Sequence, residues 1–127
     1  MSSSNQIPTK RREQVKQREL GRCALCQLAG AQWHHRRSRR VRGPHRHCAC
    51  NGVWLCPTCH RWAHSSVYEA TAWGFVLSQF ETEMFLVPYR RLGQSWMLPS
   101  CDGLLAPVPD DQVRVDGFGH PRLVQAV

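Results

Sequence analysis

Four cysteines stand in two Cys-x-x-Cys pairs that are far apart in the sequence. The first pair is Cys23 and Cys26, and the second is Cys56 and Cys59. Two thiolates at this spacing can bind one ion, and two such pairs complete a tetrahedral zinc site with no open position. The spacing therefore predicts a structural Cys₄ zinc site that joins the two ends of the segment between the pairs.

Four histidines and an asparagine lie within and directly after that segment. His34 and His35 are adjacent, so on a strand their side chains point to opposite sides. One imidazole can then bind a metal while its neighbour acts as a base, as metal-assisted phosphodiester hydrolysis requires. His60 and His64 are four residues apart and share one face of a helix, where both can reach one ion. In isolation such a pair is typical of surface histidines, but the adjoining cysteines favour ligation. An amide such as that of Asn51 can orient the base or bind the ion.

Five arginines follow the histidine pair. Guanidinium groups beside a phosphodiester site suit clamping of a DNA backbone, which gives affinity without base specificity. The alternative is a disordered basic loop, and such a loop can become ordered on DNA. The five are Arg36, Arg37, Arg39, Arg40 and Arg42.

A further group of possible ligands follows the arginines. His45, His47, Cys48 and Cys50 stand close together in the sequence, and Cys101 stands alone. Because this group can supply alternative ligands, the assignment of the cysteines to one zinc site is not unique. The roles of Cys48, Cys50 and Cys101 stay open from the sequence.

The charge is distributed unevenly along the 127 residues, a length that suits one domain. The net charge is +8, with +11 in residues 1–64 and −3 in residues 65–127. A basic half of this kind indicates a polyanionic partner, and its alternative is a solvated basic face. The N-terminus carries no apolar signal segment, so we expect a reducing cytoplasm, where paired cysteines bind metal more often than they form disulfides.

The pattern along the chain predicts a mixture of helices and short strands. We expect a basic surface helix over residues 10–20, strands over 31–35 and 53–55 with a basic loop over 36–46, and a helix from Pro57 to Gly74. Residues 75–77, 84–87 and 95–98 are β-prone, with turns at 91–94 and 101–103. Residues 1–7 and the last dozen residues are expected to be loose.

Taken together, these motifs resemble the HNH endonucleases, especially the small zinc-stapled type of phage and bacterial genomes. The resemblance covers residues 21–70, in the order Cys-x-x-Cys, Trp-His-His, Asn-x-x-x-Leu-Cys-x-x-Cys-His-x-x-x-His. Asn51, His60 and His64, spaced nine and then four apart, also match the pattern of the nuclease colicins. The resemblance implies an α+β chain with a ββα-metal core, a basic N-terminal helix and short C-terminal strands.

The resemblance also implies a role for each motif residue. His35 would be the general base, and His34, His60 and His64 would bind a catalytic Mg²⁺, Mn²⁺, Ni²⁺ or Zn²⁺ ion. Asn51 would orient the site or support the metal, and the four paired cysteines would hold a separate structural zinc. The products would be a 5′-phosphate and a 3′-hydroxyl.

The organisation implied is a basic arm over residues 1–20, an HNH nuclease domain over 21–74 and a β-rich extension over 75–127. The expected partner is DNA, with phage packaging proteins as possible further partners in a bacterial host cell. The expected function is a nicking or low-specificity DNA endonuclease. A non-catalytic zinc-stapled nucleic-acid-binding module is the alternative, and an interaction protein using its C-terminal strands is a third interpretation.

Overall fold

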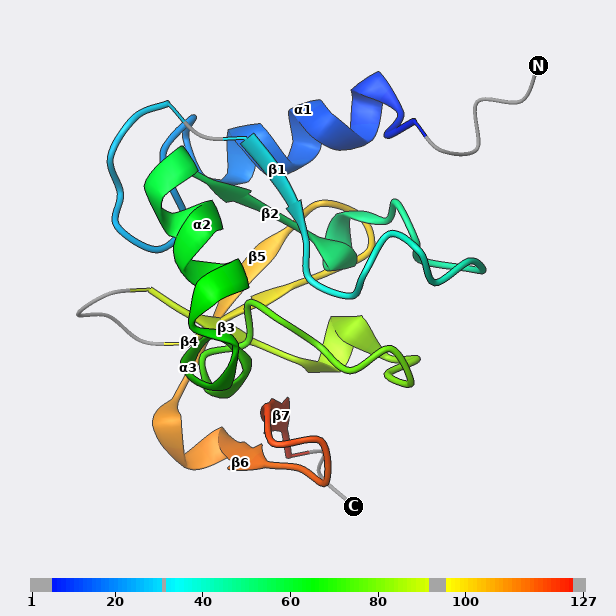
Figure 1. Cartoon of the computed structure of the whole chain (residues 1–127), viewed down its shortest axis with the longest axis vertical. Coiled ribbons are helices and arrows are strands. Elements are labelled where there is room, and N and C mark those ends of the chain that lie inside the picture. Colours follow the sequence, from blue (N-terminus) through cyan, green and yellow to red (C-terminus); the bar gives the residue numbers. More distant parts are fainter. Residues whose placement is uncertain (1–5, 31, 92–95, 125–127) are drawn as a thin grey trace.

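The chain folds into helices and short β-strands arranged in small separate sheets, as the computed structural model shows (Figure 1). The structure describes residues 6–30, 32–91 and 96–124. In these ranges the helices are α1 (Thr9–Arg18), α2 (Pro57–Ser65) and α3 (Val67–Ala72). The strands are β1 (Gln32–His35), β2 (Gly52–Leu55), β3 (Tyr89–Arg90), β4 (Trp96–Pro99), β5 (Leu105–Val108), β6 (Val113–Val115) and β7 (Pro121–Leu123). The expected mixture of helix and sheet is confirmed.

β1 and β2 form an antiparallel pair that carries the histidine dipeptide. His34 lies opposite Val53 and His35 lies opposite Gly52. A Cβ atom at position 52 would overlap the indole of Trp33, so only glycine fits there. The basic segment that follows β1 forms no helix or strand before the 3₁₀ turn Ala49–Asn51, in agreement with the loop expected over residues 36–46.

The single helix expected from Pro57 to Gly74 is wrong, because the helix divides at Ser66. The Ser66 backbone leaves the helical region, with φ −117° and ψ 58°, and α3 begins at the next residue. The bend lets Trp62 pack its ring against Trp73 and Phe75. The indole N–H of Trp62 also donates to Glu69 at 3.0 Å, which joins α2 to α3 across the break.

Two of the strands expected in the C-terminal region are absent from the described residues. Residues 75–77 make only one isolated bridge, between Leu77 and Arg37, and Met84–Leu86 is a 3₁₀ turn. The carbonyls of Met84 and Val87 accept hydrogen bonds from the buried guanidinium of Arg36 instead of from a neighbouring strand. Their backbone is therefore satisfied without a sheet.

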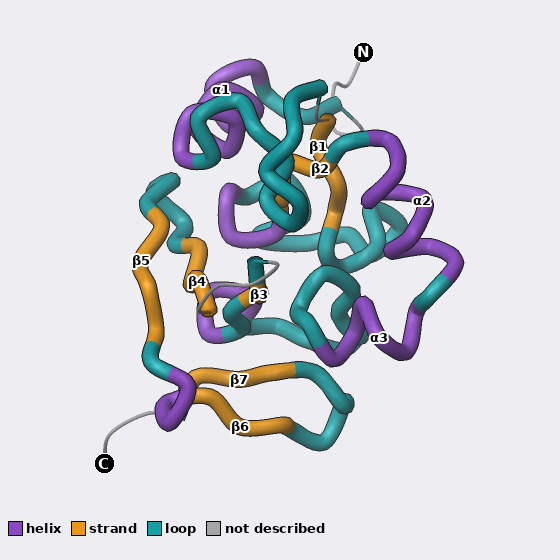
Figure 2. The backbone as a smooth tube through the Cα atoms, turned by 90° about the vertical axis from the view of Figure 1, so that its left-hand side faces the viewer, coloured by secondary structure: helices purple, strands orange, loops and turns teal. Residues whose placement is uncertain are grey.

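The remaining strands form two small sheets. β4 covers most of the strand expected over residues 95–98 and pairs with both β3 and β5. β6 and β7 form a hairpin at one end of the molecule, opposite the end where α1 lies (Figure 2). β7 corrects the expectation that the last dozen residues are loose. Residues 1–5, Ala31, 92–95 and 125–127, which include parts of the expected lead-in, first strand, turn and tail, lie outside the described residues.

The main core is formed by the turn at residues 23–25, by β2 and α2, and by two residues after position 74. Val53, Leu55 and Ala63 pack with Phe75 and Tyr89, so the C-terminal extension covers the same core as β2 and α2. α1 lies on the outside and buries only Val15, which packs against Trp33 and its neighbours. None of the described helices has the apolar length that crossing a bilayer requires.

Candidate active site and metal centres

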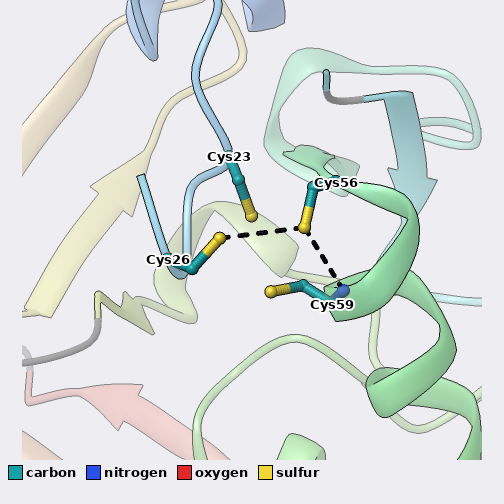
Figure 3. Close-up of side chains that lie close together, drawn as sticks. All are labelled: Cys23, Cys26, Cys56 and Cys59. Atoms are coloured by element: carbon teal, nitrogen blue, oxygen red, sulfur yellow. Dashed lines mark hydrogen bonds between the residues drawn. The ribbon is translucent and has the colours of Figure 1, made fainter. Parts of the chain in front are cut away.

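The four paired cysteines converge from two different elements. Cys23 and Cys26 come from the turn before β1, and Cys56 and Cys59 come from the start of α2 (Figure 3). All four sulfur atoms lie within 4.8 Å of one another. The Sγ atoms of Cys26 and Cys56 are 3.7 Å apart. Tetrahedral bonds of about 2.3 Å to one zinc ion would place two sulfurs roughly 3.8 Å apart, so the group fits the expected Cys₄ site.

The surroundings of this Cys₄ group favour a cation. Burial opposes ionisation of Cys56, yet hydrogen bonds from the Cys59 amide and from nearby thiols lower the pKa of Cys56. The Cys59 amide donates to Cys56 Sγ at 3.4 Å, at the N-terminus of α2. Burial and then the neighbouring thiols raise the pKa of Cys59, and a bound divalent cation would favour its thiolate. The described cysteines are all free thiols, which leaves the four available as ligands.

His34, His60 and His64 form a second group, with ligand atoms within 4.8 Å of one another. α2 carries His60 and His64 on one face, with ring centroids 4.7 Å apart. The ring of His34 on β1 lies 5.1 Å from that of His60 and 5.6 Å from that of His64. The structure thus brings together the three residues expected to bind a catalytic ion.

Hydrogen bonds orient two rings of this histidine triad. Nε2 of His34 lies 2.7 Å from the carbonyl oxygen of Phe75 and donates to it, so Nδ1 is the ring atom with a lone pair that a metal could use. Burial and then the neighbouring histidines lower the pKa of His34 to about 3, so its ring is neutral at pH 7, as a ligand must be. The side-chain amide nitrogen of Gln32 lies 2.5 Å from Nδ1 of His60 and donates to it, which fixes the orientation of the His60 ring.

The triad opens into a pocket of about 410 Å³ that also holds the candidate base. His34, His35, His60 and His64 all line this pocket, and so does Arg39. His64 is exposed, whereas His34 is 3% exposed. Three protein ligands with an exposed side leave room for water or a phosphate oxygen on the ion, which is the arrangement of catalytic rather than structural metal sites.

His35 has a partner that its sequence position does not reveal. Its Nε2 lies 3.0 Å from Nδ1 of His47, so one ring donates to the other and their relative orientation is fixed. Burial, followed by repulsion from His47, Arg39 and Arg46, lowers the pKa of His35 to about 4. The ring is therefore neutral at pH 7 and able to accept a proton. The only signal for His47 in the sequence is its place in the second His and Cys group.

Asn51 is fully buried and points at the backbone of the basic loop. Its Oδ1 accepts from the Arg37 amide at 2.7 Å, and its Nδ2 donates to the carbonyls of Arg37 and Arg46 at 3.2 and 3.0 Å. These bonds direct the amide to the loop backbone, so of its two expected roles Asn51 has the geometry for orienting the site rather than for binding the metal. Its side chain links the backbone at Arg37 to the backbone at Arg46 within the loop between β1 and β2.

The arginine run divides into buried and exposed members. Arg36 is 1% exposed and Arg37 is 5% exposed, so the expectation that they contact DNA is corrected. The Arg36 guanidinium donates to the carbonyls of Gly74 and Cys50, both at 2.9 Å, and Arg37 donates to the carbonyl of Glu81 at 2.7 Å. The remaining expected contacts, Arg39, Arg40 and Arg42, are exposed.

Comparisons with protein-family models, curated proteins and solved structures found no match to this chain. The functional interpretation therefore rests on the residues and their arrangement.

Proposed function

We propose that this protein is a metal-dependent DNA endonuclease of the HNH type. The observation that carries the proposal is the shared pocket of His34, His35, His60 and His64. Three of them form a group able to bind one ion, and the fourth lies next to that group on β1. The strand β1 and the helix α2 supply all four, and β2, which pairs with β1, lies between them in the sequence, which is the order that a ββα-metal core would have.

In this proposal, the imidazoles of His34, His60 and His64 would hold a divalent ion at the open side of the pocket. When bound, the ion supplies positive charge that stabilises the scissile phosphate and the leaving oxygen. Imidazole ligands suit Zn²⁺ and Ni²⁺, and the open positions also admit Mg²⁺ or Mn²⁺ with water. The Cys₄ group, closed and buried, would hold a separate structural zinc.

His35 would act as the general base. Its neutral ring takes a proton from the attacking water, whose oxygen forms a new bond to phosphorus as the bond to O3′ breaks. The leaving O3′ takes up a proton from solvent, and the products are a 5′-phosphate and a 3′-hydroxyl. His47 would keep the His35 ring oriented through the 3.0 Å contact between their nitrogens.

The DNA backbone would be bound by the exposed arginines next to the pocket. Arg39 lines the pocket, and Arg40 and Arg42 follow it on the same exposed loop. Contacts of this kind bind phosphate without reading bases, so a nicking or low-specificity enzyme is the form proposed. Its free thiols suit the reducing cytoplasm of a bacterial host, where phage packaging proteins would be further partners.

A second candidate function is a zinc-stapled nucleic-acid-binding module without catalysis. The Cys₄ group together with the exposed arginines would satisfy that function. It leaves unexplained why three histidines converge beside a fourth in one open pocket, because binding alone does not require them.

Cleavage of supercoiled plasmid DNA in a panel of divalent ions tests the proposal. We expect cutting by the wild type with at least one ion, and a loss of about 10²–10⁴-fold in His35→Ala, the usual contribution of a general base. Tyr68→Ala is the matched control, since Tyr68 is 93% exposed on α3 and outside the pocket lining. Circular dichroism and zinc content should be the same in all three proteins.

Two results would count against the proposal. A His35→Ala protein that cuts DNA as fast as the wild type would show that His35 is not the general base. Tight binding of DNA by the wild type, with no cutting in any ion, would instead favour the non-catalytic module.

A further inference from the structure

Three cysteines and a histidine outside the Cys₄ group also converge. His45, Cys48 and Cys50 come from the loop between β1 and β2, and Cys101 comes from the turn between β4 and β5. Their four ligand atoms lie within 4.8 Å of one another. The segment between Cys50 and Cys101 contains α2, α3 and the strands β2, β3 and β4, so the fold rather than a local sequence motif brings Cys101 to this place.

The distances in this Cys₃His group fit a tetrahedral ion. Nδ1 of His45 lies 3.7 Å from Sγ of Cys50 and 3.5 Å from Sγ of Cys101. Bonds of about 2.3 Å from zinc to sulfur and about 2.0 Å to nitrogen would separate these atoms by roughly 3.5 Å. The spacing therefore matches ligands that surround one ion rather than thiols packed only by contact.

The surroundings of the group are apolar on one side and positively charged on the other. Cys50 is fully buried beside Leu77, Met84 and Val87, where polar side chains need a partner. The fully buried guanidinium of Arg36 donates to the Cys50 carbonyl at 2.9 Å. Three thiolates and one imidazole on a Zn²⁺ ion carry a net charge of −1. That charge would compensate the buried Arg36 cation, whose guanidinium donates to main-chain carbonyls of Gly74, Cys50, Met84, Val87 and Pro88.

The backbone of His45 gives an independent indication. Its φ of +71° lies in the left-handed region that residues other than glycine adopt rarely and at a cost. The ring is held between the cysteines and Phe85, whose centroid is 5.6 Å away. A metal bond to the imidazole would offset the cost of this backbone conformation.

We propose that His45, Cys48, Cys50 and Cys101 bind a second structural zinc ion, distinct from the Cys₄ site. This zinc would fasten the basic loop to the turn between β4 and β5. His47, the partner of His35, lies between two of its ligands in the sequence, so the ion would also fix one wall of the pocket. The proposal stands on its own ligands and does not depend on nuclease activity.

Cobalt substitution in the full chain tests the proposal. Charge-transfer absorption from thiolate to Co²⁺ grows with the number of bound thiolates, and a cobalt ion on the histidine triad adds nothing to it. We expect wild-type protein to give the signal of seven thiolates, which is every cysteine in the chain. Joint replacement by Cys48→Ser, Cys50→Ser and Cys101→Ser should reduce the signal to four-sevenths, with one fewer zinc per chain in native mass spectra. Leu104→Ala, exposed in the same turn as Cys101, should retain the full signal.

Thiol labelling of the folded wild type keeps the test decisive if the triple variant does not fold. Cys48 and Cys101 are only half-buried, so without a metal they should be alkylated readily. We expect both to be protected in the zinc-loaded protein. A wild-type signal of four thiolates, together with rapid alkylation of Cys48 and Cys101 or a disulfide among the three cysteines, would overturn the proposal.

Discussion

The Cys₄ group and the histidine triad share helix α2 but differ in how they meet solvent. Cys56 caps the start of α2 and Cys59 lies in its first turn, where their sulfurs face the main core. His60 and His64 follow on the same helix and line an open pocket. Four converging thiols leave no ligand position for a substrate, whereas three imidazoles leave the outer side of an ion accessible. One helix thus places a closed centre and an open centre within two turns.

The same difference divides the arginine run. Arg36 and Arg37 directly follow β1, and their buried guanidinium groups donate to main-chain carbonyls. Like the Cys₄ group, they face the interior of the molecule. Arg39 lies at the rim of the pocket, on the side of the open centre. Residues of one chemical type, only a few positions apart, therefore hold the fold in one case and line an open pocket in the other.

The largest effect is expected from the closed centre. Cys59→Ser removes one ligand from the Cys₄ group, and structural zinc in small zinc-binding peptides contributes about 10–16 kcal/mol of apparent folding free energy. We expect the variant to lose its zinc and its cooperative thermal transition. Thr58→Ala, an exposed change between Cys56 and Cys59, is the control and should melt as the wild type does. Wild-type melting of Cys59→Ser with that zinc absent would show that the group does not stabilise the fold.

The next effect separates the buried arginine from the exposed one. Arg36→Met leaves several buried carbonyls without their donor, and we expect the free energy of unfolding to fall by about 1–3 kcal/mol for each carbonyl that stays unpaired. Arg39→Met should leave stability within about 0.5 kcal/mol of the wild type, because it is a surface change. Urea denaturation of both variants measures the difference. Equal free energies of unfolding in the two variants would show that the hydrogen bonds of Arg36 do not stabilise the fold.

A smaller effect is expected from acid. The unfolded pKa of a histidine is near 6.5, and burial lowers the folded pKa of His34 to about 3. Between these values the unfolded chain takes up a proton that the folded protein excludes, so stability is present above pH 6.5 and is lost as the pH falls. The slope from His34 is up to roughly 1.4 kcal/mol per pH unit.

His34→Gln isolates that contribution. Glutamine cannot titrate and keeps an amide that can donate toward the Phe75 carbonyl. Unfolding free energies at pH 6.5, 5.75 and 5, without added divalent ion, should therefore fall less steeply in the variant than in the wild type. Parallel slopes would mean that His34 is not buried as a neutral ligand.

The smallest effect is expected on DNA binding, from the exposed arginines next to the histidine pocket. Replacing Arg39, Arg40 and Arg42 by alanine should weaken DNA binding and reduce the slope of log K against log salt by about one unit for each arginine that contacts phosphate. Arg114→Ala, an exposed change on β6, should leave the slope as it is. Fluorescence anisotropy across a salt series is the measurement, and an unaltered slope in the triple variant would remove these arginines from the interface.

Local spacing in the sequence was enough to predict which residues pair within each of these two groups. The Cys-x-x-Cys pairs and the spacing of His60 and His64 are short-range patterns that a turn or helix converts directly into geometry. The strand pair and the first part of α2 were predicted for the same reason. The break at Ser66 was not, because it results from packing of Trp62 against Trp73 and Phe75 rather than from a helix-breaking residue.

What the sequence could not predict depends on long-range burial. Nothing in the residue type separates Arg36 from Arg39, since only the position of the core decides which guanidinium is enclosed. Cys101 reaches the second group of cysteines through the turn between β4 and β5, and no local motif marks it. Similarly, the segment at Met84–Leu86 has strand-like composition, but its carbonyls are already bonded to Arg36.

The central claim is that the histidine triad binds the catalytic ion while His35 acts as the base. Titration of a catalytic divalent ion into wild type, His64→Ala and His35→Ala, each with its structural zinc retained, tests this claim most directly when plasmid cleavage is measured on the same samples. We expect His64→Ala to lose both ion affinity and cutting, and His35→Ala to bind the ion as the wild type does while its cutting rate falls by about 10²–10⁴-fold. Wild-type ion affinity and cutting in His64→Ala, or wild-type cutting in His35→Ala, would contradict the account.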